Sequence, residues 1–342
     1  MAGIKFALIG CGAIAESFYI PVLSRDHSIC SELHLVDPNP DRLEDLGRRF
    51  RVTSTGVTLD PVLGGIDAAI IATPPDTHFP LAARLLAAGR HVLCEKPFTV
   101  LPEDAEALVA QAAAAGLVVA TNNFRRGLAT FDRIAAITRM GELGRLQRIA
   151  WAEGVKFNWP TKSGFYFTQK GQGGLPPPGV LLDIGAHVVD LVCWWCGVAP
   201  VVAECRTDSF GGPEARVRIV LDCGGTEARI DLSYYQRMSN SYTLDFERGS
   251  ISGVANEGYR FQIARDGAGP VTAQFPDGRI GTFELAARIL ARFVAATRGE
   301  GRPLVTGREV VPSIRAIAQG YRVAEPFEAP WLPHDIRCEA RA

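Results

Sequence analysis

The chain has 342 residues, of which 47% are hydrophobic and 21% are charged, as in a globular protein large enough for two domains. Its formal net charge of −1 provides no overall field that attracts nucleic acid or an anionic membrane, so we expect neither as a partner. The apolar runs are too short to cross a bilayer, and glycines interrupt the first of them, so we predict a cytoplasmic protein.

The eight cysteines lie mostly in apolar or strand-like surroundings, which favours buried, reduced thiols. Cys193 and Cys196 form a C-x-x-C pair, but they flank two tryptophans in an apolar helical run. Since no second pair at metal-binding spacing accompanies them, we interpret both as core residues and predict no metal site.

Short apolar runs alternate with helical segments through the first 120 residues. Strands are predicted at Ile4–Ile9, 33–36, 68–72, 91–94 and 117–121, and amphipathic or alanine-rich helices at segments such as 80–88 and 103–115. This alternation predicts a parallel sheet covered by helices on both faces. Gly89 and Gly116 stand where helix C-caps are expected.

The pattern changes from about residue 145. Strand-like alternation with glycine-rich turns predicts a mostly antiparallel sheet from segments 145–156, 201–208, 215–222, 227–235 and 242–247. Helices are predicted at about 181–196, at 282–298 and at 307–324. Thr306 and Glu309 form a capping-box pattern at the start of the last helix, and Pro312 is expected to kink or delay it.

The chain is therefore predicted to be an α/β protein with a doubly wound parallel sheet in residues 1–122 and an α+β domain in residues 123–324. The segment 158–178, rich in glycine, proline and aromatic residues, is long enough to be a binding loop. The tail 325–342 is expected either to wrap over a neighbour or to be loose.

A dinucleotide fingerprint follows the first predicted strand. The stretch 10–15 matches G-x-G-x-x-A, in which the first glycine permits a tight turn and the second lets a pyrophosphate approach the backbone. The small Ala15 lets helix and strand pack closely, and the free N–H groups of the helix start favour the phosphates. The loop residues Gly10, Cys11, Gly12, Ala13 and Ile14 are thus candidate cofactor contacts.

Asp37 ends the second predicted strand, 25 positions after Gly12. Its carboxylate suits the two hydroxyls of an adenosine ribose and would repel a 2′-phosphate, so NAD(H) is favoured over NADP(H). Arg42 would soften this preference if its side chain turned back toward the ribose.

Thr73, Pro74 and His78 follow the strand predicted at 68–72, where open α/β sheets place their ligands. Prolines stiffen this loop, which favours either a firm contact with the nicotinamide or simply a sharp turn that caps a helix. For His78, a structural role and a cofactor contact are equal alternatives.

Asp183 and His187 are four residues apart, so on a helix they share one face and form a proton-handling pair. Lys96 lies far upstream and offers a cation that can hold a developing alkoxide. Taken alone, the lysine also fits a surface residue before a turn, and the pair fits a helix-surface ion pair. Beside the fingerprint, the three residues favour hydride-transfer chemistry.

The chain resembles the Gfo/Idh/MocA oxidoreductases nearly end to end, in the motifs GCGAIA, ATPPDTH, CEKPF, NNFRR, MGELGRLQRI and GVLLDIGAHVVDLVCWWCG. The resemblance implies a Rossmann domain and a second domain with an open, largely antiparallel sheet. That sheet often forms subunit interfaces in the family, which implies a homodimer or homotetramer. Three consecutive prolines, 176–178, depart from the family's usual glycine run and leave the substrate unassigned.

The resemblance also implies residue roles. Lys96, Asp183 and His187 match the family's catalytic residues, and Arg125 or Arg126 would help to shape the substrate pocket. The implied cofactor contacts are Gly10–Ile14, Asp37, Thr73, Pro74, His78, Glu95, Lys96 and Asn123. Aromatic residues of 157–167, above all Trp159 and Tyr166, would stack on a sugar, or else pack as ordinary loop residues. In some relatives the Lys-Pro bond is cis.

These observations predict an NAD(H)-dependent oxidoreductase that transfers a hydride between nicotinamide and a secondary carbinol or ketone of a sugar, cyclitol or nucleotide-linked sugar. His187 is the candidate general base because its reference pKa of about 6.5 is near working pH. Asp183 would orient it or bond a substrate hydroxyl, and Lys96 would bond the reacting oxygen or itself relay the proton. Two alternatives stay open: NAD-assisted glycoside cleavage or elimination without net redox change, and a non-catalytic regulator.

Overall fold

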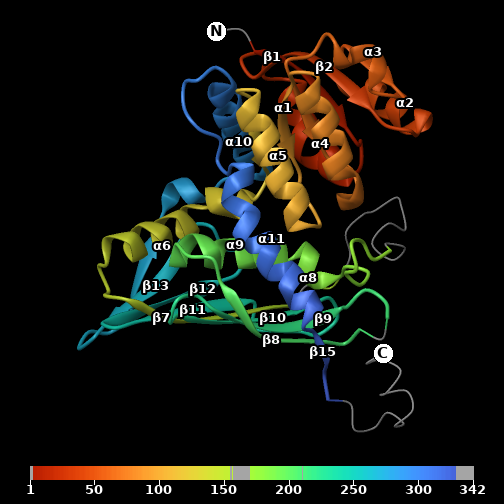
Figure 1. Cartoon of the computed structure of the whole chain (residues 1–342). Coiled ribbons are helices and arrows are strands. Elements are labelled where there is room, and N and C mark those ends of the chain that lie inside the picture. Colours follow the sequence, from red (N-terminus) through yellow and green to blue (C-terminus); the bar gives the residue numbers. More distant parts are fainter. Residues whose placement is uncertain (1–2, 155, 157–169, 210, 329–342) are drawn as a thin grey trace. The chain divides into compact units, whose positions relative to one another are not determined.

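A computed structural model describes residues 3–154, 156, 170–209 and 211–328, which form two compact units (Figure 1). The described residues of the first unit run through Gly127 and include Ile280–Val311, and the rest form the second unit. The chain therefore does not divide at one point near residue 122. Residues 280–311 join the first unit because the Phe293 ring packs 6.2 Å from that of Phe6.

The sheet of the first unit has six parallel strands in the order β3-β2-β1-β4-β5-β6, as the alternating pattern predicted. Its strands are β1 (Ile4–Ile9), β2 (Cys30–Val36), β3 (Ser54–Gly56), β4 (Ala68–Ile71), β5 (His91–Cys94) and β6 (Val119–Thr121). The three residues of β3 were not predicted, because so short and polar a segment carries no apolar alternation.

Helices cover this sheet. They are η1 (Ala15–Tyr19), α1 (Ile20–Leu23), α2 (Pro40–Arg49), α3 (Asp60–Leu63), η2 (Pro75–Thr77), α4 (His78–Ala87), α5 (Pro102–Ala114), η3 (Phe124–Gly127), α10 (Thr282–Thr297) and the start of α11 (Gly307–Arg322). Gly89 and Gly116 follow α4 and α5 with φ of +75° and +66°, which confirms the predicted left-handed helix ends. The turn η1 is π-helical, and it directly precedes α1, where Pro21 lacks the N–H of a regular helix.

The helix α11 begins at Gly307, so Pro312 lies inside it and does not delay its start. Glu309 fulfils its part of the predicted capping box, because its Oε2 accepts the Thr306 N–H at 2.9 Å. The boundary between the two units falls within α11, after Val311.

The second unit contains a nine-stranded sheet in the order β14-β13-β12-β11-β7-β10-β9-β8-β15. Its strands are β7 (Leu146–Gly154), β8 (Val201–Thr207), β9 (Arg216–Asp222), β10 (Glu227–Ser233), β11 (Ser241–Phe246), β12 (Gly249–Val254), β13 (Arg260–Arg265), β14 (Val271–Gln274) and β15 (Glu325–Pro326). The pairs β7–β10 and β8–β15 are parallel and the others antiparallel, so the sheet is mostly antiparallel, as predicted.

One face of this sheet is covered by α6 (Ala129–Met140), α8 (Val180–Asp183), α9 (Gly185–Cys196) and the second half of α11, as Figure 1 shows for α8, α9 and α11. Val217, Ile219 and Leu221 of β9 are fully buried on that face, whereas Arg218 and Val220 between them are half-exposed on the other. The core includes Trp151 and Tyr242, whose stacked rings lie 5.3 Å apart, together with Phe131 and Trp195.

The described cysteines are all free thiols, and each is buried except the half-buried Cys196, as predicted. Cys338 lies outside the described residues. None of the helices in the described ranges combines the length and hydropathy needed to cross a membrane.

Candidate active site

The glycine loop after β1 has the geometry that a bound pyrophosphate requires. Gly10 adopts a φ of +87°, and a Cβ there would lie 2.6 Å from the carbonyl oxygen of Ala72, so a side chain is excluded. At Gly12, a Cβ would meet no described atom within 4 Å, so the backbone is open to a ligand. Ala13 and Ile14, half-buried, follow at the start of the helical segment. The loop therefore fits the dinucleotide phosphates.

Asp37 lies directly after β2 and joins the loop to the next turn. Its Oδ2 accepts the backbone N–H of Cys11 at 2.8 Å, and its Oδ1 accepts that of Asn39 at 2.9 Å. The Cys11 side chain is buried, so this residue takes part through its backbone.

Arg42 lies beside the same loop and is fixed by acidic partners. Its Nε donates to the carbonyl of Cys11 at 2.7 Å, and its other nitrogens pair with Glu16 and Asp45. The hydrogen bond from Arg42 lowers the pKa of Glu16, so Glu16 stays ionised. Sequence reasoning missed Glu16, although an acid in the first turn after a fingerprint is a visible signal.

Thr73 and Pro74 follow β4 at the carboxyl edge of the sheet, and the hydroxyl of Thr77 donates to that of Thr73 at 2.6 Å. The His78 ring has no exposed surface. Its Nδ1 lies 2.8 Å from the carbonyl of Pro97 and its Nε2 lies 2.9 Å from that of Thr73. Burial lowers the pKa of His78. The ring thus ties the Thr73 loop to the Pro97 segment, and its direct contact with a cofactor stays a prediction.

Glu95 fixes the segment that carries Lys96, directly after β5. Its Oε1 accepts the hydroxyl of Tyr19 at 2.6 Å and the amide of Asn122 at 2.7 Å, and its Oε2 accepts the N–H of Lys96 at 3.1 Å. The Lys96–Pro97 bond is cis. Sequence reasoning missed Tyr19 and Asn122, since nothing local links them to Glu95.

Asn123 and the two arginines follow β6. Asn123 is buried, and its Oδ1 accepts the Thr121 hydroxyl at 3.2 Å. The side chains of Arg125 and Arg126 are also buried, and Arg126 pairs with Glu309 at 3.3 Å. The predicted cofactor residues therefore follow strands β1, β2, β4, β5 and β6, at the edge where α/β sheets bind ligands.

Asp183 and His187 belong to the second unit. Ile184, between α8 and α9, has helical backbone angles (φ −74°, ψ −40°), so the two elements form one helical run, as predicted, with Asp183 at the end of α8 and His187 in the first turn of α9. The hydroxyl of Tyr234 donates to Asp183 Oδ2 at 2.6 Å, and His187 is 5% exposed. Tyr234 was not predicted as a site residue, although it lies at the end of the strand predicted over 227–235 and directly follows the observed β10. Trp159 and Tyr166, the predicted substrate-stacking residues, lie outside the described residues.

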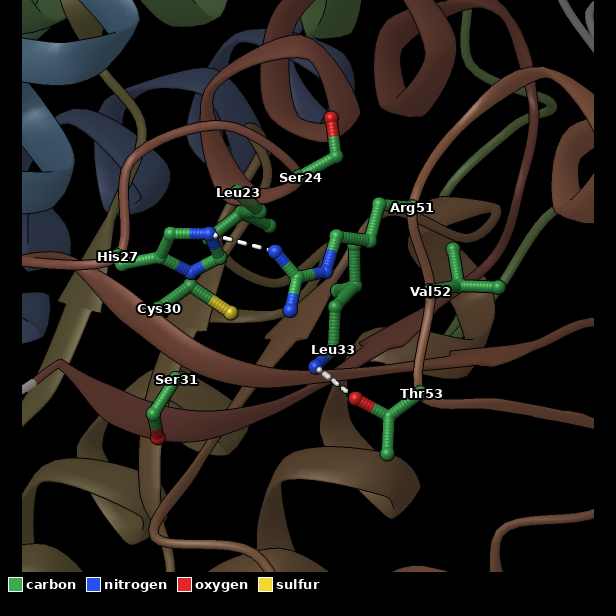
Figure 2. A pocket seen from close by; sticks show the side chains of 9 residues that line it. All are labelled: Leu23, Ser24, His27, Cys30, Ser31, Leu33, Arg51, Val52 and Thr53. Atoms are coloured by element: carbon green, nitrogen blue, oxygen red, sulfur yellow. Dashed lines mark hydrogen bonds between the residues drawn. The ribbon is translucent and has the colours of Figure 1, made fainter.

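A cavity of about 270 Å³ lies near the amino ends of β2 and β3 (Figure 2). It is lined by Leu23, Ser24, His27, Cys30, Ser31, Leu33, Arg51, Val52 and Thr53. Arg51 contacts His27 Nε2 at 2.9 Å beside it. Since the predicted cofactor residues follow the carboxyl ends of the strands, this cavity is not part of the candidate site.

The strand order, the glycine loop after β1 and the acid after β2 define the first unit as a dinucleotide-binding Rossmann domain. A model of the oxidoreductase family GFO_IDH_MocA, with an NAD-binding Rossmann fold, matches residues 4–123. A model of the GFO/IDH/MocA C-terminal domain matches residues 131–252. The chain therefore belongs to the Gfo/Idh/MocA family and is an NAD(P)-dependent oxidoreductase.

Among curated proteins, the chain is similar to the 1,5-anhydro-D-fructose reductase of Ensifer adhaerens, with 28% identity over 320 residues, or 91% of this chain and 93% of the relative. Three further curated oxidoreductases match over about half of their own length, 51% to 52%.

Two solved structures share the fold. The aldose-aldose oxidoreductase of Caulobacter crescentus has a TM-score of 0.79 and 22% identity, covering 94% of this chain and 97% of its own. The 3-ketoreductase KijD10 of Actinomadura kijaniata, in complex with NADP and TDP-benzene, has a TM-score of 0.79 and 20% identity, covering 95% and 99%.

Proposed function

We propose that this protein is an NAD(H)-dependent oxidoreductase that interconverts a secondary carbinol and a ketone on a sugar, cyclitol or nucleotide-linked sugar. One observation carries the proposal: Lys96 follows β5 at the same sheet edge as the glycine loop, and its backbone is anchored by the buried Glu95. A lysine held at this edge is suited to act on a substrate bound against the cofactor.

The residues that would hold the cofactor are those of the first unit. The open backbone at Gly12 and the following N–H groups would bind the pyrophosphate, and Asp37 would accept the ribose hydroxyls. When bound, the dinucleotide supplies the hydride acceptor or donor.

The remaining chemistry is proton transfer at the substrate oxygen. Lys96 would hold that oxygen as its charge develops, and His187 would take the hydroxyl proton in oxidation or return it in reduction. Asp183, held by the Tyr234 hydroxyl at 2.6 Å, would orient His187 or bond a neighbouring substrate hydroxyl. The proposal requires these groups from both units to act on one substrate.

The preference for NAD(H) is supported by the charges around Asp37. A 2′-phosphate would meet the carboxylates of Asp37 and Glu16, and Arg42 is already paired with Glu16 and Asp45. An arginine engaged in this way does not neutralise a phosphate, so NADP(H) would bind with uncompensated repulsion.

The sugar-like substrate is supported by the reductase relative, which aligns along nearly its whole length. The direct test incubates the purified protein with NADH, NAD⁺, NADPH or NADP⁺ and a panel of 1,5-anhydro-D-fructose, myo-inositol, aldoses and UDP-N-acetylglucosamine. We expect a change in absorbance at about 340 nm with one panel member, the signature of hydride transfer. A protein that binds NAD(H) but leaves every panel member chemically unchanged would contradict the proposal.

Lys96→Ala should lower the turnover rate strongly without weakening the binding of the cofactor. We expect kcat to fall on the order of 10²- to 10⁴-fold, because the cation at the reacting oxygen is lost. The Kd for NADH, measured by fluorescence, should stay within about twofold. The matched control is Lys5→Ala, since Lys5 is an exposed lysine of the same unit that pairs with Glu32. Normal turnover by the Lys96 variant would show that the assignment is wrong.

We also propose a homodimer or homotetramer through the face of the nine-stranded sheet that no described helix covers (Figure 1). Opposite charges alternate along that face, as in the pairs Arg148–Asp245 at 2.8 Å and Arg218–Asp231 at 2.7 Å. Such a mixed surface can pair with a second copy of itself around a two-fold axis.

A further inference from the structure

The start of α8, the short helix that ends at Asp183, is bonded by two residues distant in the sequence. The backbone oxygen of Glu214 accepts the N–H of Val180 at 3.0 Å, and its Oε1 accepts that of Leu181 at 2.8 Å. The Tyr321 hydroxyl oxygen accepts the N–H groups of 179 and 182 at 3.3 and 3.2 Å. The first N–H groups of a helix have no hydrogen-bond acceptor within the helix. Here Glu214 and Tyr321 supply an acceptor to each of the four N–H groups of residues 179–182.

Glu214 and Tyr321 also bond each other. The Tyr321 hydroxyl donates to Glu214 Oε1 at 2.9 Å, so this hydroxyl uses its one hydrogen and two lone pairs. Both side chains are buried, with 2% and 7% exposure. The backbones pack closely, because a Cβ on Gly179 would lie 1.9 Å from the carbonyl oxygen of Glu214.

The same segment reaches Asp183 by a second route. The carbonyl of Ala215, next to Glu214, accepts the N–H of Tyr234 at 2.8 Å, and the Tyr234 hydroxyl donates to Asp183 Oδ2 at 2.6 Å. Asp208 fixes the segment in turn, since its Oδ1 accepts the N–H of Ala215 at 2.9 Å. Residues 214–215 therefore contact both the backbone leading to Asp183 and the backbone of Tyr234, whose phenol bonds the Asp183 carboxylate.

We propose that Glu214 and Tyr321 are positioning residues, which fix the helix start and thereby hold the carboxylate of Asp183 in its reactive place. This role rests on the proposed function, in which Asp183 contacts substrate or His187. Burial raises the pKa of Glu214 to about 7. A carboxyl group kept where its charge is disfavoured is more typical of a functional site than of a packing position.

The test compares Tyr321→Phe, Glu214→Leu and Glu214→Gln with a matched control, Tyr242→Phe. Tyr242 is a buried tyrosine of the same unit whose hydroxyl has no hydrogen-bond partner among the described residues. Hydrogen exchange of amides 179–182 is followed by mass spectrometry. Since Tyr321→Phe and Glu214→Leu each remove a hydrogen-bond acceptor, we expect the exchange of amides 179–182 to become roughly 5- to 10-fold faster in these two variants. The Gln variant keeps an acceptor oxygen, so it and the control should exchange like the wild type.

Turnover is measured with 1,5-anhydro-D-fructose and NADH, or with the panel sugar that the wild type converts fastest. We expect Tyr321→Phe and Glu214→Leu to lower kcat on the order of 10²-fold, as for a misplaced reactive group. Their Kd for NADH should be unchanged, and Glu214→Gln should recover most of kcat.

Wild-type exchange rates in both Tyr321→Phe and Glu214→Leu would show that these two residues do not cap the start of α8. Fast exchange with unchanged kcat would overturn the positioning role. A wild type inactive on every sugar would overturn the proposed function and with it this role in catalysis, while the exchange rates would still decide the cap.

Discussion

At the scale of single residues, Glu95 shows how one buried carboxylate organises a loop. Three donors converge on it: the hydroxyl of Tyr19, the amide of Asn122 and the backbone N–H of Lys96. Burial and the neighbouring Glu95 raise the pKa of Tyr19 well above its usual value, so Tyr19 remains a donor at physiological pH. Charge-assisted bonds of this kind are stronger than neutral ones, so Glu95 holds the Lys96 segment firmly.

Cofactor preference is decided by individual charges. The double variant Asp37→Ser with Glu16→Gln removes both carboxylates and releases Arg42 from Glu16. We expect the ratio of kcat/KM for NADPH over NADH to rise roughly 10- to 100-fold, because each close like-charge contact costs about a kcal/mol or more. The measurement is steady-state kinetics with both cofactors.

The control for this experiment is Glu44→Gln. Glu44 pairs only with the exposed Arg48 on the surface of α2 among the bonds described for it. The Glu44→Gln variant also removes one carboxylate, but this carboxylate is exposed and interacts only weakly with its surroundings. An equal shift in the control, or none in the double variant, would contradict the proposed NAD(H) selection.

At the scale of elements, local sequence rules predict the helical run of α8 and α9 but miss several strands of the second unit. The run 181–196 predicts one helix, and Ile184 between α8 and α9 keeps helical angles, although the turn tightens there, where the N–H of His187 bonds the carbonyl of Ile184 at 3.0 Å. Besides β3 and the two-residue β15, the strands β12, β13 and β14 were missed, since serine, glycine, glutamine and arginine fill much of them and blur the alternation. Pairing with neighbouring strands, rather than local propensity, makes them strands.

The cap on α8 predicts a pH effect on stability. Burial raises the pKa of Glu214 from 4.5 to about 7 in the folded protein. The folded state thus binds this proton more tightly than the unfolded chain, so the associated stability is present below pH 4.5 and is lost as pH rises through about 7. The full loss in the free energy of unfolding is roughly 3 kcal/mol.

Glu214→Gln cannot ionise, so its stability should fall less than that of the wild type between pH 5 and 8, by up to roughly 3 kcal/mol. Urea unfolding at several pH values measures the difference. Parallel pH curves for the two proteins would show that the carboxyl titrates normally.

At the scale of the whole molecule, the nine-stranded sheet has two different faces. Helices cover one face of the nine-stranded sheet, and no described helix lies along the other (Figure 1). Ala150 lies in the middle of that face, on β7 between Arg229 and Thr243 of the neighbouring strands, and it is exposed.

If copies associate there, Ala150→Arg should dissociate them, because an arginine buried without a partner costs several kcal/mol. Size-exclusion chromatography with light scattering measures the mass. The control is Ala114→Arg, at an exposed position near the end of α5. An unchanged mass in the Ala150 variant would exclude this face as the interface.

The sequence by itself determined the parallel sheet, the glycine loop and the family, because these depend on short-range patterns: apolar strands, turn glycines and motifs such as Glu95-Lys96-Pro97. Only the tertiary structure decided that residues 280–311 join the first unit, that Tyr234 bonds Asp183, and that Glu214 and Tyr321 bond the start of the helix that carries it. Tyr321 bonds a backbone group 142 positions away. Such contacts arise from the packing of separate elements, and no local pattern in the chain encodes them.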